Sequence, residues 1–192
     1  MQKFARIISI VFIPPTLTLI SFIYLAFEYE IELVQRIFVA VVALVFGVVM
    51  QIASFMFFYK RGMISDVDAK DKQERNIPYL VSIVIFIIGF ALLLFAKVNT
   101  ISLAFWFCYI SNTFLVILIN KYLKISIHAM GVSGPLALFV FLLGIKAFVF
   151  LPILFTVGWS RVKLKVHSIL EVIAGIIFGF ISVYLQLFLF IN

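Results

Sequence analysis

The sequence predicts an all-α fold, a polytopic transmembrane helical bundle with six to seven membrane segments in a single domain covering residues 1–192. Two observations predict this fold. Of the 192 residues, 66% are hydrophobic and 12% are charged, whereas a soluble domain is about 45–50% apolar and about 25% charged. The apolar residues also form continuous runs of about 20 residues, the length of a helix that spans a bilayer.

The apolar runs place the expected spans along the chain. In order, they cover residues 4–27, 33–59, 78–97, 101–121, 129–159 and 167–191. Lys3 and Arg6 stand at the start of the first run, as in a signal peptide, but the run is too long for one and no cleavage site follows, so we expect an uncleaved helix. Pro14 and Pro15 should kink this helix.

The run 129–159 has two interpretations, because it fits one long helix or two short ones broken near residues 143–148. Gly144 and Lys146 stand where such a break would fall. The choice decides which side of the membrane each loop faces. With two short helices, three polar stretches face the same side: residues 60–77, 121–128 and 159–167. With one helix, the third lies opposite the others.

Charge and cysteine content exclude several classes of function. The net charge of +7 is ordinary for the basic loops of a membrane protein, so we expect no nucleic-acid partner, and nothing in the sequence predicts a protein partner. The lone cysteine, Cys108, excludes an intramolecular disulfide and should simply pack. Gly175 and Gly179 form a pair of small residues typical of close helix packing.

Polar residues gather where the last apolar run begins, in "SRVKLKVHSILEVIAGIIFG", residues 160–179. His167 and Glu171 are four residues apart, which places them on one helix face. A carboxylate beside an imidazole orients the ring as a base or nucleophile. Arg161 has the side chain best shaped to hold a phosphate. The alternative interpretation is a basic cluster at the level of the lipid headgroups.

The second histidine, His128, occupies an equivalent position. It opens an apolar run within "KISIHAMGVSG", residues 124–134, with serine and lysine nearby. A histidine at an interface is usually just solvated, but two at equivalent helix starts are less ordinary. A third polar segment, "DVDAKDKQERN" at residues 66–76, has the composition of a solvated loop.

Residues 160–179 resemble the third signature of the type 2 phosphatidic acid phosphatase superfamily, S-R-x5-H-x3-D followed by A-G-x3-G. Ser160, Arg161 and His167 fall in register, and Glu171 stands where the family has aspartate. The following helix matches through Ala174, Gly175 and Gly179.

The other two signatures match less well. "ISIH", residues 125–128, resembles P-S-G-H through Ser126 and His128. In the first signature, K-x6-R-P, Arg75 stands for the arginine and Asp68 falls where the lysine should be. Lys70 or Lys72 would then substitute for that lysine, and Asn76 replaces the proline. The resemblance covers about residues 60–180, the expected phosphatase-like core.

The resemblance implies hydrolysis of a lipid or isoprenoid phosphate or diphosphate without a metal or other cofactor. His167 would be the nucleophile that forms a phosphohistidine, Glu171 would orient it, and His128 would be the general acid. The implied phosphate-binding residues are Arg161, Arg75, Ser126, Lys72 and Ser160. A cationic pocket between two imidazoles suits phosphoryl transfer, which depends mainly on positioning and charge neutralisation.

One site can form from three signatures only if their loops share a side, so this function requires the break near residues 143–148. The opposite side would then carry only Arg36, Lys97 and Lys146 among its basic residues. The excess of lysine and arginine on the signature side places the site on the cytoplasmic face of the cell membrane.

Two alternatives stay open. Asp66, Asp68 and Asp71 would suit Mg²⁺ on a diphosphate, as in a metal-dependent membrane prenyltransferase. The chain would otherwise be a catalytically inactive lipid-binding protein on the phosphatase fold, which would bind phosphate without turnover.

Overall fold

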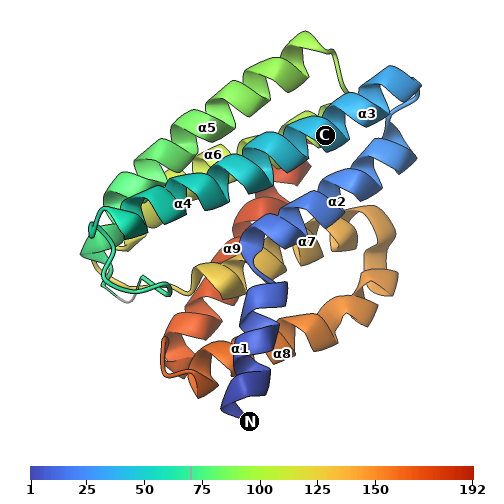
Figure 1. Cartoon of the computed structure of the whole chain (residues 1–192). Helices are drawn as coiled ribbons and strands as arrows, with labels where there is room; N and C mark the ends of the chain where they lie inside the picture. The colour runs from blue at the N-terminus through green and yellow to red at the C-terminus, as the bar shows by residue number, and fades with distance from the viewer. Residues whose placement is uncertain (70) are drawn as a thin grey trace. The chain divides into compact units, whose positions relative to one another are not determined.

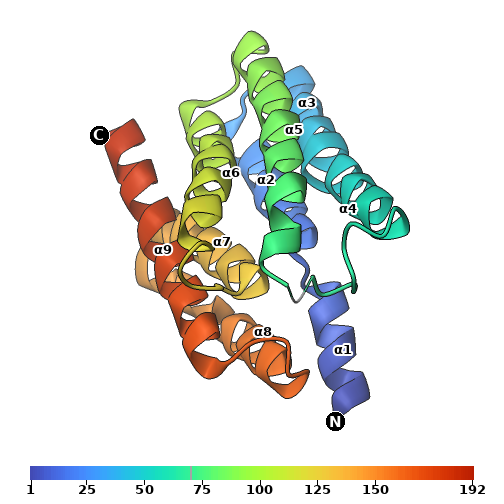
Figure 2. The same cartoon turned by 90° about the vertical axis from the view of Figure 1, so that its left-hand side faces the viewer.

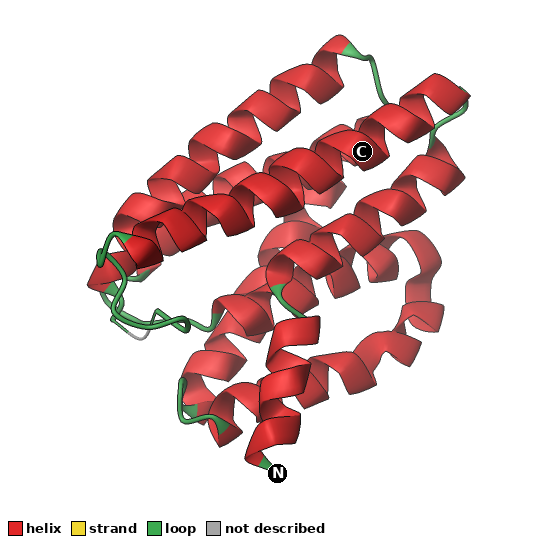
Figure 3. Cartoon of the chain, in the orientation of Figure 1, coloured by secondary structure: helices red, strands yellow, loops and turns green. Residues whose placement is uncertain are grey.

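The computed structural model describes residues 1–69 and 71–192, and within these ranges every regular element is a helix (Figure 3). Lys70, one of the two lysines suggested for the first signature, lies outside the described residues. The chain forms two compact units, described here one at a time. Unit 1 comprises Met1–Leu17 and Leu123–Asn192, and unit 2 comprises Thr18–Tyr122.

The helices follow the predicted spans closely (Figure 1). Unit 1 contains α1 (Gln2–Val11), α7 (Ile127–Leu143), η3 (Gly144–Phe150), α8 (Leu151–Lys163) and α9 (Ile169–Ile191). Unit 2 contains most of α2 (Pro14–Tyr29), then α3 (Leu33–Val42), η1 (Ala43–Val49), α4 (Met50–Lys60), η2 (Gln73–Arg75), α5 (Asn76–Phe95) and α6 (Thr100–Ile119).

Helical stretches long and apolar enough to cross a membrane account for most of the described residues. There are five: Leu33–Lys60, Gln73–Phe95, Thr100–Ile119, Ile127–Lys163 and Ile169–Ile191. The bent pair of α1 and α2 would make a sixth. The chain is thus a helical protein with apolar helices of membrane-spanning length. A helix suits this environment because it satisfies its own backbone hydrogen bonds in lipid. The exact total of six to seven segments stays a prediction.

The predicted kink at the first two prolines is confirmed. α1 ends at Val11, α2 begins at Pro14, and the two helices are bent by 43°. Proline has no N–H to donate and its ring opposes a continuous helix. Within unit 1, Pro14 packs against α7, since a Cβ added to Gly131 would lie 2.8 Å from the Pro14 ring.

The predicted break near residues 143–148 is also confirmed. α7 ends at Leu143, and Gly144 has φ +60° and ψ −139°, a conformation that residues with a Cβ rarely adopt. The 3₁₀ segment η3 then turns the chain, and α8 packs back against α7 (Figure 1). The start of α7 and the end of α8 therefore lie at the same end of unit 1.

Unit 1 is held together mainly by the packing of α7 on α9. Gly175 faces the backbone of Ser126, and Gly179 faces Ser133 and Met130. The predicted role of the two glycines in close helix packing is confirmed, because a side chain at either position would occupy the space of α7.

In unit 2, α6 lies beside α5 (Figure 2), and the Trp106 ring on α6 packs against Phe22 and Phe86 in an aromatic core. Its indole N–H donates to the Phe86 carbonyl at 2.7 Å. Gly89 makes room for the ring, since an added Cβ would meet the indole directly. Cys108 is buried on the same helix, as predicted, and its thiol donates to the Ala104 carbonyl at 3.3 Å.

Glu30 joins the two loops at one end of unit 2. Its buried carboxylate accepts hydrogen bonds from the Asn99 N–H, at 2.9 and 3.1 Å, and from the Ser102 hydroxyl at 2.7 Å. These donors belong to the start of α6, where the helix dipole favours a negative charge. The carboxylate thus secures the connection between α2 and α3 to the N-terminus of α6.

Candidate active site

The third signature lies where α8 ends and α9 begins. After α8, Lys165 adopts a positive φ of 56° and closes a turn. The Arg161 carbonyl accepts hydrogen bonds from the N–H groups of Val166, at 3.2 Å, and His167, at 3.3 Å. Bonds of this type satisfy the last carbonyls of a helix. The backbone of His167 is therefore attached to the last turn of α8.

The His167 side chain contacts Glu171 as the spacing predicts. Its Nδ1 lies 2.8 Å from Glu171 Oε2, and the imidazole is only 2% exposed. Because an ionised carboxylate can only accept, Nδ1 carries the proton and Nε2 carries the lone pair of the neutral ring. This is the tautomer that a nucleophilic or basic Nε2 requires.

Glu171 also caps the helix on which it lies. Ser168 is the N-cap of α9, and its hydroxyl accepts from the Glu171 N–H at 3.2 Å. The Glu171 carboxylate in turn accepts from the Ser168 N–H at 3.2 Å. This reciprocal capping box fixes the carboxylate. One rigid side chain therefore stabilises the helix start and orients His167.

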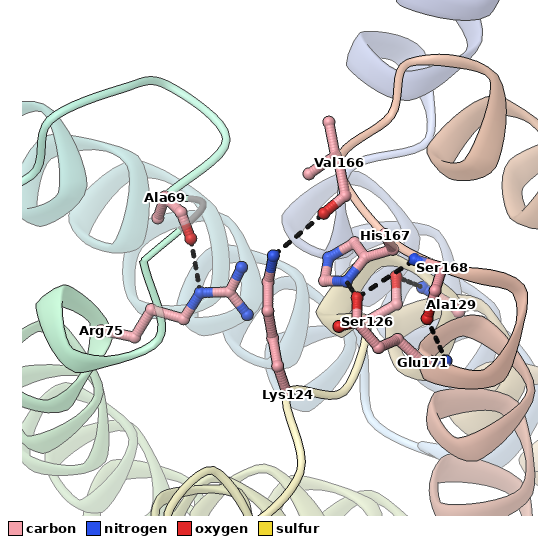
Figure 4. A network of polar contacts seen from close by, with 9 residues as sticks. All are labelled: Ala69, Arg75, Lys124, Ser126, Ala129, Val166, His167, Ser168 and Glu171. Atoms are coloured by element: carbon pink, nitrogen blue, oxygen red, sulfur yellow. Dashed lines mark hydrogen bonds and ion pairs between the residues drawn. The ribbon is translucent and has the colours of Figure 1, made fainter.

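The second signature is joined to the third within unit 1 (Figure 4). Ser126 is the N-cap of α7, and its hydroxyl accepts from the Ala129 N–H at 3.4 Å. The Ser126 N–H donates to the main-chain carbonyl of Glu171 at 3.1 Å. The close approach is possible because Gly175 has no side chain.

Two of the expected phosphate-binding residues have partners inside the protein. Ser160 is fully buried, and its hydroxyl donates to the Val157 carbonyl at 2.7 Å. Arg161 is 1% exposed, and its Nη1 donates to the Ser9 hydroxyl at 2.5 Å. Ser9 lies on α1, so the N-terminal helix contributes directly to the surroundings of the third signature. Its sequence signal is weak: a single polar residue within an apolar run.

His128 lies in the first turn of α7, two residues after Ser126, and is half-buried. The structure therefore places the second histidine at the start of a helix whose N-cap is bonded to Glu171. Its role as the general acid stays a prediction.

The first-signature residues Arg75 and Lys72 belong to unit 2. Arg75 is 4% exposed, and its Nε donates to the Ala69 carbonyl at 2.7 Å. Lys72 Nζ donates to the Lys121 carbonyl at 3.1 Å. Both side chains order the segment between α4 and α5. Their assignment as phosphate ligands stays a prediction.

Lys124 was not among the site residues predicted from the sequence, although it directly precedes the second signature, residues 125–128. Its Nζ donates to the Val166 carbonyl at 3.0 Å. Val166 directly precedes His167, so the ammonium lies beside the third signature. The basic residue itself was visible in the sequence, but its contact spans 42 residues.

The aspartates considered for a magnesium site are engaged in turns. Asp66 Oδ1 accepts from the Asp68 N–H at 2.7 Å, and Asp71 Oδ1 accepts from the Gln73 N–H at 2.9 Å. Such bonds from a side chain to the backbone two residues on are typical of turns. Within the described ranges, no three His, Cys, Asp or Glu side chains gather as a metal site would require.

In comparisons with known proteins, no family model, no curated protein and no solved structure matches the chain.

Proposed function

We propose that this protein is a membrane phosphatase that hydrolyses a lipid or isoprenoid phosphate or diphosphate through a phosphohistidine. The observation that carries the proposal is the 2.8 Å contact between His167 Nδ1 and Glu171 Oε2. In the neutral ring it favours the tautomer with the proton on Nδ1 and the lone pair on Nε2. The bond from the Ser126 N–H to the Glu171 carbonyl adds support, because it brings the second signature to the same place.

The reaction begins with attack by His167 Nε2 on phosphorus. The N–P bond forms as the P–O bond to the alcohol breaks, and His128 donates a proton to the departing oxygen. Glu171 stabilises the positive charge that develops on the ring through the bond to Nδ1. Water then attacks the phosphohistidine and gives a proton to His128, which releases phosphate and restores both histidines.

The surroundings suit an anionic substrate that is carried by the bilayer. Arg161 contributes a buried positive charge in the turn that leads to His167, and the first turn of α7 presents the positive end of a helix dipole. The apolar helices would place the protein in the bilayer, from which a lipid phosphate would arrive. We place the site on the cytoplasmic side of the cell membrane, because lysine and arginine are enriched in the loops that carry the signatures.

The test is phosphate release from a panel of lipid and isoprenoid phosphates by the purified protein in detergent, with EDTA present. We expect turnover by the wild type, none by His167→Ala, and an intermediate rate for Glu171→Gln, which keeps a hydrogen bond but loses the charge. Full activity of His167→Ala would reject the mechanism. Activity abolished by EDTA and restored by Mg²⁺ would favour a metal-dependent enzyme, and phosphate binding without turnover would favour an inactive lipid-binding protein.

A further inference from the structure

Lys124 places a positive charge beside His167. Its Nζ donates to the Val166 carbonyl at 3.0 Å. Val166 is 4% exposed and immediately precedes His167. The ammonium is thus held at the carbonyl of the residue before His167. The bond is partly buried, and a charge there interacts more strongly than in water.

The orientation of the His167 ring shows which of its edges points toward the Lys124 ammonium. His167 Nδ1 is bonded to Glu171, so the other edge of the imidazole carries the lone pair. In Figure 4 that edge points toward the side on which the Lys124 ammonium lies. A group attacked by Nε2 would therefore sit between the ring and the ammonium.

We propose that Lys124 is a phosphate-binding residue that holds the phosphoryl oxygens while His167 attacks. This inference rests on the proposed function, and it adds a residue which the signatures do not assign. Phosphoryl transfer places negative charge on three equatorial oxygens, and a cation that neutralises them lowers the barrier. The ammonium is a compact charge on a flexible stem, which lets it follow the oxygens as the phosphoryl group moves.

Two neighbouring cations are placed less well for this task. Arg161 is 1% exposed and donates to Ser9. Lys165 is exposed, in the turn after α8. Lys124 differs from both, because its ammonium is held at the carbonyl of the residue before His167, on the side toward which the Nε2 edge of the ring points in Figure 4.

The test must separate the charge of Lys124 from its bond to Val166. Lys124→Gln keeps a hydrogen-bond donor but removes the charge, and Lys124→Arg keeps both a donor and the charge. Lys165→Gln is the control, since it removes one lysine from the turn between α8 and α9 that the Lys124 ammonium contacts. Two quantities are measured for each protein: kcat/KM for phosphate release, and the rise in unfolding temperature that orthovanadate, a mimic of the transferring phosphoryl group, produces.

We expect Lys124→Gln to lower kcat/KM and vanadate affinity by about 10- to 100-fold, the effect of losing one charge-assisted hydrogen bond. Lys124→Arg should recover most of both, and Lys165→Gln should match the wild type. Normal kcat/KM and vanadate affinity in Lys124→Gln would overturn the inference and leave the proposed function standing. A wild type that binds vanadate through Lys124 without turnover would refute the proposed function alone. A wild type that binds no vanadate would overturn the role of Lys124.

Discussion

Replacing Gly175 by alanine tests the contact between α7 and α9 on which the candidate site depends. A Cβ at this position would lie 2.6 Å from the Ser126 carbonyl oxygen, 3.3 Å from its nitrogen and 3.4 Å from its carbonyl carbon. All three atoms belong to the backbone, so no side-chain rotation can relieve the overlap. The start of α7 must instead move away from α9.

The size of the effect follows from these distances. A carbon contact is comfortable at about 3.5–4.0 Å, so the two backbones must separate by roughly 1 Å. Overpacking of this kind typically costs about 1–3 kcal/mol. The same movement stretches the 3.1 Å bond from the Ser126 N–H to the Glu171 carbonyl. Because a displacement of about 1 Å can reduce catalysis by about 100-fold, we expect activity to fall by about 10- to 100-fold.

The assay compares thermal unfolding in detergent and phosphate release for the wild type and Gly175→Ala. Gly134→Ala is a matched control on the same helix pair, because its added Cβ would meet only a side-chain methyl of Val183, at 3.3 Å. That methyl can shift by a few tenths of an ångström, so we expect a loss of less than about 1 kcal/mol and nearly normal activity.

Two results would refute the reasoning. Wild-type stability and activity in Gly175→Ala would show that the close approach of α9 to Ser126 does not hold the site. Equal damage from Gly134→Ala would show that general loosening of the helix pair, rather than the contact with Ser126, is responsible.

Three further changes test individual side chains. His128→Ala should slow hydrolysis of an alkyl phosphate by about 10²–10⁴-fold but spare much of the activity on an aryl phosphate, whose oxygen leaves without protonation; equal loss on both would argue against the acid role. Ser9→Ala removes the acceptor of the Arg161 bond and should lower the free energy of unfolding by about 1.5–3 kcal/mol, with Ser9→Thr close to the wild type; unchanged stability of Ser9→Ala would show that the bond contributes little. Glu30→Gln removes the charge that Asn99 and the N-terminus of α6 stabilise. It should lower the free energy of unfolding, measured by thermal unfolding, by about 1–2 kcal/mol. Wild-type stability would contradict this account of the carboxylate.

The features of the fold that depend on local composition were largely predictable. Continuous apolar runs predicted the spans, because a helix in lipid needs only length and hydrophobicity. Pro14 predicted the kink, and Gly144 marked the break between α7 and α8, because both residues restrict or permit backbone conformations by themselves. The contact of His167 with Glu171 was predicted from their spacing of four residues and is present, but the placement of both residues on one helix face was wrong, because α9 begins at Ile169.

The capping box is a local feature that was not predicted. Ser168 stands directly after His167, and Glu171 follows three residues later, which is the pattern of a helix N-terminus. It shows that His167 lies just outside α9 rather than within it. The imidazole still reaches Glu171, because the capping box turns the carboxylate back toward the residues that precede the helix.

The sequence by itself determined the helical membrane fold, the two turns that divide it, and the pairing of His167 with Glu171, because each depends on residues within a few positions of one another. Only the tertiary structure decided which distant groups meet them. Lys124 reaches Val166 across 42 residues, and Arg161 reaches Ser9 across 152. Such contacts depend on how α1, α7, α8 and α9 pack in unit 1. That packing is set by side-chain shape, as at Gly175 and Ser126, which no local pattern in the sequence encodes.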